Sequence, residues 1–533
     1  MNSELALGDR LDRRTSRLGA LIVSMVVSMV VLREQSPLGW DEAVYAARAK
    51  DLALTNFDWS TISSGYWSDL RAPGFPAFLG LAFEVAGISD FVARGVVVIF
   101  SVGLLAVIAA TLDLFNKPRV GTSAIAITIA CPGFLATSTL AFADHPGAFF
   151  SVLAVYFALR SYTNETSSPL FMVPISLGIA TTVRFGAVMF VVAPLGIIGL
   201  AVLWRYTRSK DPRQLVSFVA AGATSVVVVG YLLTSQLLTR YASPIGAKQA
   251  RITEVGNASS NWVHDLKTIL APGPVDYGFN GAFWGWSYAA IFTLLAIMVV
   301  VRLLIYRRIV ALAMVIAISL TPVLLYGLTV RQFVTTYLAP EFAIGAAMLA
   351  WGYWVAVESD RPSRRSASDE ATRNRTSSSQ GLLIVAVSLV YLIVGSRTFI
   401  GVSNMHNRLQ GFEQVRVASV LANDLLGEEC RLFTTRVPQA AWYSDCKVAG
   451  FSSGFVEDDS GRSVDEQLNE YIAKQASRTS ITDRVNALGF LILEGVSNQP
   501  KIDTVWPNRD PDRSVMLSSP RGRRVALVGM PLP

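Results

Sequence analysis

The sequence has few charged residues and few side chains of the kinds that form metal sites. Charged residues make up 16% of the chain, against about 25% in a soluble globular protein. The three histidines are too few and too scattered for a histidine-rich metal site. We find no internal repeat in the chain. The polar C-terminal part, after residue 400, contains no glycine-rich phosphate loop. The net charge of +7 does not indicate nucleic acid, because the basic residues cluster in short loops between apolar segments.

Long apolar segments are abundant instead, and 52% of the residues are hydrophobic. A membrane-spanning helix needs about 20 mostly apolar residues. Segments near this length lie at residues 18–34, 92–114, 120–141, 146–161, 169–183, 185–204, 215–238, 283–305, 309–330, 337–357 and 381–399. The sequence therefore predicts a polytopic α-helical membrane protein with about 11 transmembrane helices. We expect the first segment to be retained, because no small-residue cleavage site follows it.

The loop charges predict the orientation of these segments. Basic residues cluster at the N-terminus and at residues 117–119, 205–213, 307–308 and 361–375, so we expect these loops to be cytoplasmic. The loops at 35–91 and 239–282 are then external. We interpret the apolar residues 72–88 as an interfacial or re-entrant helix, because a further span would invert every later loop. Residues 358–380 read as a disordered cytoplasmic linker.

The composition changes near residue 400, which predicts two domains, a membrane domain at 1–400 and a soluble extracytoplasmic α/β domain at 401–533. Within the second domain, a helical pattern at 408–427 and another at 464–476 alternate with short strands. The strands are expected at residues 431–434, 448–451, 490–493, 514–517 and 524–528. Cys430 and Cys446 lie in this tail and form either one disulfide or two free, buried thiols. Cys131 lies within an apolar segment and is expected to pack there.

Acidic residues occur beside two apolar segments. Asp41 and Glu42 lie just past the first one, and adjacent carboxylates at a membrane boundary are costly without a role. Either of them could act as a general base, or the pair could cap a helix. Asp144 precedes Pro146 at the start of another apolar segment. It is a second candidate for the catalytic site, and its alternative role is that of a helix N-cap.

Basic side chains on the external side are candidates for binding a lipid phosphate, for which arginine is well suited. The stronger candidates are Arg71, Arg94 and Arg184, and the others are Lys248, Arg251 and Arg331. The alternatives are pairing with the acidic residues or extension to the lipid headgroups. Tyr337 opens a span in the sequence Tyr-Leu-Ala-Pro, where an interfacial tyrosine is the alternative.

In their order, these motifs resemble the polyprenyl-phosphate-dependent membrane glycosyltransferases of the GT-C fold, in particular the protein O-mannosyltransferase and aminoarabinose transferase group. The resemblance covers about residues 15–360. It rests on Asp41-Glu42, Arg71-Ala72-Pro73, Arg94, Asp144 and Tyr337-Leu338-Ala339-Pro340. The group typically has Pro-Pro where Ala72-Pro73 stands, and aminoarabinose transferases usually have an arginine where Ala43-Val44 stands. The sugar and the acceptor therefore stay open.

The resemblance implies transfer of a sugar, with inversion, from a polyprenyl-phosphate-linked donor to a hydroxyl of a glycan, lipid or protein. It implies that Asp41 is the base, at the external face of the plasma (inner) membrane. The need for a divalent metal varies among GT-C enzymes, and no ligand set is clear here. An essential metal is therefore not predicted, and a divalent metal stays an open alternative. The alternative is a transporter or a flippase for lipid-linked sugars. Transporters place charges inside their spans, whereas the spans here are nearly free of charge.

Overall fold

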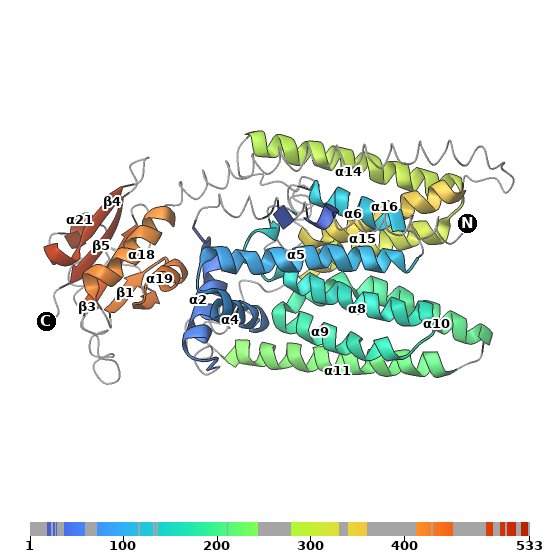
Figure 1. Ribbon diagram of the computed structural model, residues 1–533, viewed down its shortest axis with the longest axis horizontal. Helices are drawn as coiled ribbons and strands as arrows, with labels where there is room; N and C mark the ends of the chain where they lie inside the picture. Colours follow the sequence, from blue (N-terminus) through green and yellow to red (C-terminus); the bar gives the residue numbers. More distant parts are fainter. Residues whose placement is uncertain are drawn as a thin grey trace, which may run out of the picture. The chain divides into compact units, whose positions relative to one another are not determined.

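The protein was analysed as a computed structural model (Figure 1). The structure describes residues 19–22, 25–26, 28, 37–58, 72–115, 118–131, 134, 137–209, 212–242, 279–329, 339–359, 412–427, 430–450, 487–493, 502–506, 509–518 and 524–530. The chain divides into two compact units. The first consists of Met1–Glu34, Asp69–Phe78 and Arg94–Val402, and the second of Gln35–Ser68, Leu79–Ala93 and Ser403–Pro533.

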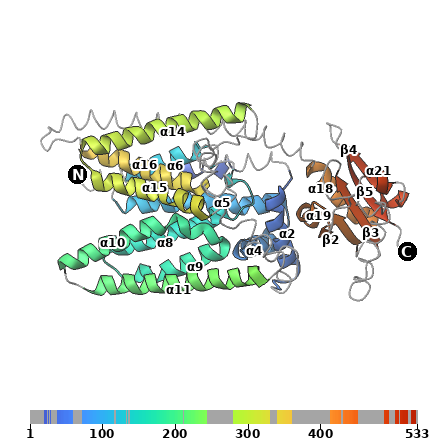
Figure 2. The same ribbon diagram turned by 180° about the vertical axis from the view of Figure 1, so that it is seen from behind.

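Helices make up the described part of the first unit. They are α5 (Asp90–Asp113, from Arg94), α6 (Pro118–Ile129), α8 (Asp144–Asn164), η1 (Ser168–Phe171), α9 (Met172–Val183), η2 (Phe185–Phe190), α10 (Val192–Ser209), α11 (Pro212–Ala242), α14 (Phe279–Ile305), α15 (Ile309–Thr329) and α16 (Ala339–Ser359). Figures 1 and 2 show α8, α9, α10 and α11 side by side, and α9 packs against both α8 and α11. A continuous apolar core joins these helices to α6 and α16.

Two of the described helices are long and apolar enough to cross a membrane, at Asp90–Asp113 and Pro212–Ser235. Exposed apolar side chains cover α11, among them Val216, Val219, Val226, Val227 and Tyr231. Such a surface is unusual on a protein surrounded by water and suits contact with lipid. The total of about eleven spans stays a prediction, since most of the segments at 18–34 and 381–399 lie outside the described residues.

Two predicted spans are interrupted. The segment 120–141 is not one helix, because α6 ends at Ile129. Pro132-Gly133 follows this end in the sequence, and a proline removes a hydrogen-bond donor and restricts the preceding residue. The segment 185–204 is divided into η2 and α10. Pro194 lies in the first turn of α10, where proline is tolerated.

The apolar residues 72–88 form α4 (Gly74–Ala86), which has 13 residues. At a rise of 1.5 Å per residue, this helix is about 20 Å long, shorter than the roughly 30 Å of a hydrocarbon core. Its length is that expected of an interfacial or re-entrant helix.

The second unit contains α2 (Trp40–Leu54) and a five-stranded sheet with the strand order β2-β1-β3-β5-β4. The strands are β1 (Cys430–Thr434), β2 (Lys447–Gly450), β3 (Ala487–Leu493), β4 (Val515–Ser518) and β5 (Arg524–Met530). Strand β1 is parallel to β2 and β3, whereas β5 is antiparallel to β3 and β4. Every predicted strand is present, with small shifts at the ends, and β4 and β5 form the predicted pair.

Helices pack against this sheet and against α2. Helix α18 (Phe412–Leu426) packs against β3 and β5, and most of its buried residues belong to the apolar core of the sheet, namely Val415, Ala418, Ala422 and Leu426. The short helix α19 (Val437–Tyr443) connects β1 to β2 and packs against α2. Two smaller elements, α21 (Ile502–Val505) and η5 (Pro511–Arg513), complete the described part of the unit. The predicted helix at 464–476 lies outside the described residues.

Candidate functional site

An ion pair between Asp144 and Arg184 is the main polar feature of the described helical unit. Asp144 is the first residue of α8, and Arg184 directly follows α9. The Arg184 Nη1 pairs with the Asp144 Oδ1, and the two side chains are only 14% and 7% exposed. Ala143, and not Asp144, occupies the N-cap position of α8. The structure therefore contains the ion pair of Arg184 with an acidic residue, which was one alternative for this arginine. The alternative role of Asp144 as a helix N-cap is not observed.

The local backbone explains the position of Arg184. Its φ and ψ of −155° and 123° are extended, so it separates α9 from η2. A Cβ added to Gly147 of α8 would lie 3.1 Å from the Arg184 Cβ, which shows how closely the two segments approach. The Ser151 hydroxyl donates a hydrogen bond of 2.9 Å to the Ala187 carbonyl. Helix α8 thus fixes the segment that carries Arg184.

A second close approach joins the start of α4 to the end of α9. A Cβ on Gly74 would lie only 2.8 Å from the backbone carbonyl carbon and oxygen of Thr182. Real Cβ atoms do not approach backbone this closely, so the position requires glycine. The Ala72-Pro73-Gly74 segment therefore lies against the last turn of α9, two residues before Arg184.

His145 follows Asp144 in the sequence and is a buried neighbour of the ion pair. Its side chain is fully buried, and its Nε2 lies 2.9 Å from the Thr137 Oγ1. The ring also contacts Phe134 edge to face, with 4.8 Å between the ring centroids. These contacts connect the start of α8 to the segment before it.

Asp41 and Glu42 share the first turn of α2 in the second unit. Glu42 is 3% exposed, and its Oε2 accepts a hydrogen bond of 2.9 Å from the Gly39 N–H. Glu42 therefore caps its own helix, which was the structural alternative for this pair. For Asp41 the structure describes the backbone only.

Among the basic candidates, Arg94 lies in α5 and is 3% exposed. The remaining candidates lie outside the described residues, namely Arg71, Lys248, Arg251, Arg331 and Tyr337. Of the predicted site residues, the structure thus brings Asp144 and Arg184 together in one unit and Asp41 and Glu42 together in the other.

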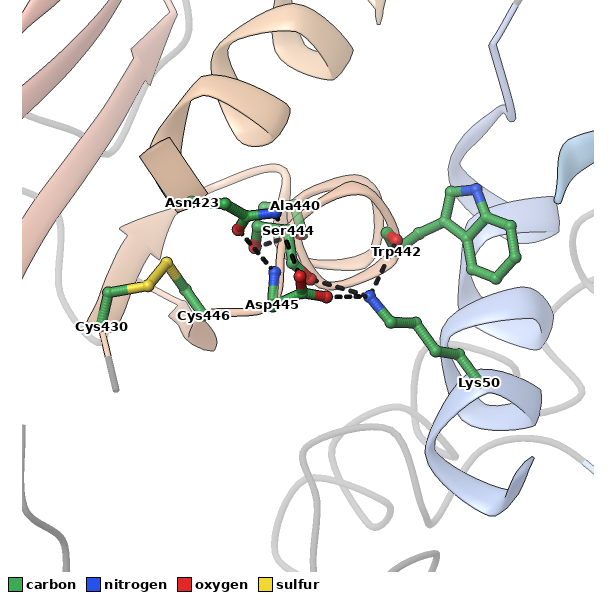
Figure 3. Close-up of polar contacts among 8 residues, drawn as sticks. All are labelled: Lys50, Asn423, Cys430, Ala440, Trp442, Ser444, Asp445 and Cys446. Atoms are coloured by element: carbon green, nitrogen blue, oxygen red, sulfur yellow. Dashed lines mark hydrogen bonds and ion pairs between the residues drawn. A yellow bond between two sulfur atoms is a disulfide. The ribbon is translucent and has the colours of Figure 1, made fainter. Parts of the chain in front are cut away.

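Sequence reasoning missed a group of polar contacts within the second unit, between α2 and the segment after α19. Figure 3 shows Lys50 directed at Trp442, Ser444 and Asp445. Lys50 is about 400 positions from each of these partners in the sequence, and none of the four residues belongs to a motif. The disulfide beside them, Cys430–Cys446, is the bridge that was one of the two alternatives expected for these cysteines.

The chemistry of the described residues is that of anion binding and proton transfer. Arg184 and Arg94 are cations in largely buried positions, and arginine binds phosphate oxygens well because of its fork of N–H donors. A carboxylate can accept a proton from an attacking hydroxyl. Within the described ranges, no group of three or more histidine, cysteine, aspartate or glutamate side chains is placed to bind a metal ion.

Comparisons with known proteins agree with this chemistry. Residues 70–236 match the sequence family described as dolichyl-phosphate-mannose-protein mannosyltransferase. The matched region contains Arg71, Arg94, Asp144 and Arg184. No curated protein matches the chain by sequence.

Solved structures with a similar fold match nearly the whole chain. ArnT from Cupriavidus metallidurans bound to undecaprenyl phosphate matches with a TM-score of 0.60 and 14% identity, over 96% of this chain and 97% of that chain. The apo state of the same protein matches over the same shares, with a TM-score of 0.57 and 15% identity. The fold shared with ArnT and the sequence match at residues 70–236 confirm the resemblance noted in the sequence, and the protein is accordingly a membrane glycosyltransferase with the GT-C fold, similar to the group of protein O-mannosyltransferases and aminoarabinose transferases.

Proposed function

We propose that the protein transfers a sugar from a polyprenyl-phosphate-linked donor to a hydroxyl group of a glycan, lipid or protein. The reaction takes place at the external face of the plasma (inner) membrane, and the C-terminal domain also lies outside the cytoplasm. A donor attached to a polyprenyl lipid suits this location, because nucleotide sugars are absent outside the cytoplasm.

The observation that carries the proposal is the buried ion pair of Asp144 and Arg184 inside the region that matches the mannosyltransferase family. A guanidinium group has five N–H donors in a planar fork, and this geometry makes arginine well suited to phosphate oxygens. A structure of ArnT, whose fold this chain shares, contains undecaprenyl phosphate. A phosphate bound to a prenyl chain is therefore the ligand that we propose for Arg184 and the other basic candidate residues.

In the proposed reaction, Asp41 removes the proton of the acceptor hydroxyl while the hydroxyl oxygen attacks the anomeric carbon of the sugar. The new bond joins this oxygen to the anomeric carbon, and the bond that breaks joins the anomeric carbon to the phosphate oxygen. The polyprenyl phosphate leaves with the electron pair of that bond. The attack comes from the face opposite to the leaving group, so the configuration of the sugar inverts.

The basic residues stabilise the leaving group. Negative charge develops on the phosphate as the bond breaks, and fixed cations aimed at developing charge accelerate a reaction. Arg71, Arg94 and Arg184 have this role, and Asp144 orients Arg184 through their ion pair. Lys248, Arg251, Arg331 and Tyr337 are further residues proposed to bind the substrates. Glu42 fixes the first turn of α2, which also carries Asp41.

The proposal is tested with the purified protein in lipid nanodiscs, a set of polyprenyl-phosphate sugars and cell-envelope fractions as acceptor. We expect transfer of sugar label to an acceptor and release of polyprenyl phosphate in equal amounts. Mass spectrometry of envelope glycans from cells with and without the protein then identifies the sugar and acceptor. Release of polyprenyl phosphate without transfer of the sugar to an acceptor would contradict the proposal. So would envelope glycans that are identical in cells with and without the protein. Activity that survives EDTA would show that no divalent metal is essential.

A further inference from the structure

Helix α2 is attached at its C-terminal half to the segment 442–445, which we call the contact segment. Lys50 of α2 is the centre of this attachment (Figure 3). Its Nζ donates hydrogen bonds of 3.0 Å to the Asp445 Oδ1, 3.0 Å to the Ser444 carbonyl and 3.4 Å to the Trp442 carbonyl. An ammonium group has three donors, and all three are used. Two of the acceptors are carbonyls at the C-terminal end of α19, where a cation is favourable.

The N-terminal end of α2 is attached to the same segment. The Leu38 N–H, which precedes the N-cap residue Gly39, donates a hydrogen bond of 2.8 Å to the Tyr443 hydroxyl. The Tyr443 hydroxyl in turn donates a hydrogen bond of 2.8 Å to the Asp90 Oδ2. One hydroxyl group therefore connects the entry of α2 to the first residue of α5.

Asp90 makes a second contact with the contact segment. Its Oδ1 accepts a hydrogen bond of 2.6 Å from the Trp442 indole N–H. The Trp442 ring also packs against Phe83 of α4, with 5.4 Å between the ring centroids, and Trp442 is only 5% exposed. A carboxylate that accepts from two adjacent aromatic side chains defines their orientation closely, because hydrogen bonds to charged groups are strong and directional.

The contact segment is itself fixed to the sheet. The Asp445 N–H donates a hydrogen bond of 2.8 Å to the Asn423 Oδ1 of α18. The next residue, Cys446, is joined by the disulfide to Cys430, which begins β1. The attachment of α2 therefore reaches the sheet through a covalent bond as well as through hydrogen bonds.

We infer that Lys50, Asp90 and the contact segment are positioning elements that set the orientation of the first turn of α2, and hence of Asp41. This inference rests on the proposed function, because it concerns the placement of the proposed base. The two attachment points, Leu38 and Lys50, are 12 residues apart, about 18 Å along a helix. They lie on either side of Asp41, so neither the tilt nor the axial position of α2 is free. Misplacing a reacting group by 1 Å can cost about 100-fold in rate.

The test uses the full chain in nanodiscs with three conservative variants. Tyr443→Phe removes the hydroxyl, Asp90→Asn removes the charge of the shared acceptor, and Lys50→Met removes the ammonium group at nearly constant length. We expect each to lower kcat by about 10-fold, part of the effect of a misplaced base, with a donor KM within about twofold of the wild type. The exchange of α2 amide hydrogens should increase in each variant.

Asp503→Asn is the matched control. Asp503 is 76% exposed and pairs with Arg524 at 2.9 Å in the same unit, away from α2. This variant should leave kcat and the exchange of α2 unchanged. A double variant of Asp90→Asn and Tyr443→Phe should lose less kcat than the product of the two single effects, because the two residues share one hydrogen bond.

The outcomes separate the two claims. An inactive wild-type protein would contradict the proposed function. An active wild type with unchanged kcat in all three folded variants would overturn the positioning inference alone. A loss of kcat without increased exchange in α2, or an equal loss in the Asp503→Asn control, would overturn it as well. Size-exclusion profiles and unfolding temperatures identify any variant that fails to fold, and the remaining variants then decide the question.

Discussion

Asp144 at the start of α8 and Arg184 at the end of α9 form an ion pair whose side chains are almost fully buried. The pair joins two helices that otherwise pack through apolar side chains. A buried ion pair adds little stability compared with a well-packed apolar pair, but loss of one partner leaves an uncompensated charge. The pair is therefore a point where a single substitution affects both the packing and the charge of the candidate site.

We expect Asp144→Asn to destabilise the protein by about 3 kcal/mol, because it removes the charge of one partner of a buried ion pair. Glu165→Gln is the control, since Glu165 is 73% exposed in its ion pair with Arg205 and such a pair contributes only about 0–1 kcal/mol. Chemical denaturation of both variants in the same detergent measures the difference. Equal stabilities would show that the buried pair is not a structural requirement.

Asp41→Asn should lower the turnover by about 100- to 10,000-fold, which is the usual effect of losing a general base. Glu42→Gln should lose much less, because an amide oxygen can still accept the hydrogen bond from the Gly39 N–H. Single-turnover assays with a polyprenyl-phosphate sugar measure both rates. Near-normal turnover by Asp41→Asn would refute the assignment of the base, and near-normal turnover by the double variant would refute any role for this acidic pair in the chemistry.

Gly74→Ala should destabilise the helical unit by about 1–3 kcal/mol, the usual effect of overpacking. The added methyl group would lie 2.8 Å from the Thr182 backbone, which cannot move aside easily. In contrast, Gly196→Ala in α10 adds a methyl group with nothing within 4 Å and should not destabilise. Thermal unfolding of the two variants compares them directly, and equal unfolding temperatures would count against the close approach of α4 to α9.

Replacing both Cys430 and Cys446 by alanine should destabilise the sheet-containing unit by about 2–4 kcal/mol. The bridge closes a loop with a sequence separation of 16 and also fixes the residue next to Asp445. Peptide mapping of the wild-type protein without reductant should recover one peptide pair linked through these cysteines. Complete alkylation of both thiols before reduction would show that no bridge forms in the cell.

The topology can be tested by labelling single cysteines in a cysteine-free background with a reagent that does not cross membranes. The loop charges predict that a cysteine at position 452 is labelled in intact cells and that one at position 368 is labelled only after lysis. These positions lie in the predicted external domain and cytoplasmic linker. The reverse pattern would invert the assignment of every loop.

Local features of the sequence were sufficient to predict most elements of the fold. Short apolar patterns predict the strands and α18, and long apolar segments predict α5 and α11. These elements can be read from the sequence because burial or contact with lipid determines which of their positions are apolar. The prediction was wrong at residues 120–141, where a continuous apolar composition hides the end of α6 at Ile129. Hydropathy measures side chains, whereas that helix end is a property of the backbone beside Pro132.

The candidate site was less accessible from the sequence. Arg184 could be recognised because a cation interrupts an apolar stretch, but three carboxylates were equally suitable partners, and only the packing of α8 against α9 identifies Asp144. The contacts of Lys50 could not be predicted, because Asp445 is 395 residues away and is one of many exposed acidic residues. Long-range polar pairs leave no periodic signal.

The distance in sequence between α2 and the contact segment also determines the order of events during synthesis. Leu38 and Tyr443 are separated by 405 residues, so at about 5–20 residues per second the ribosome completes α19 roughly 20–80 s after α2. During this interval α2 has left the ribosome without the residues that bind it at both ends. The second unit can therefore assemble only after nearly the whole chain has been made. A chain that terminates before the contact segment carries the proposed catalytic base on a helix that this segment does not hold. This is true however many of its transmembrane helices have been inserted.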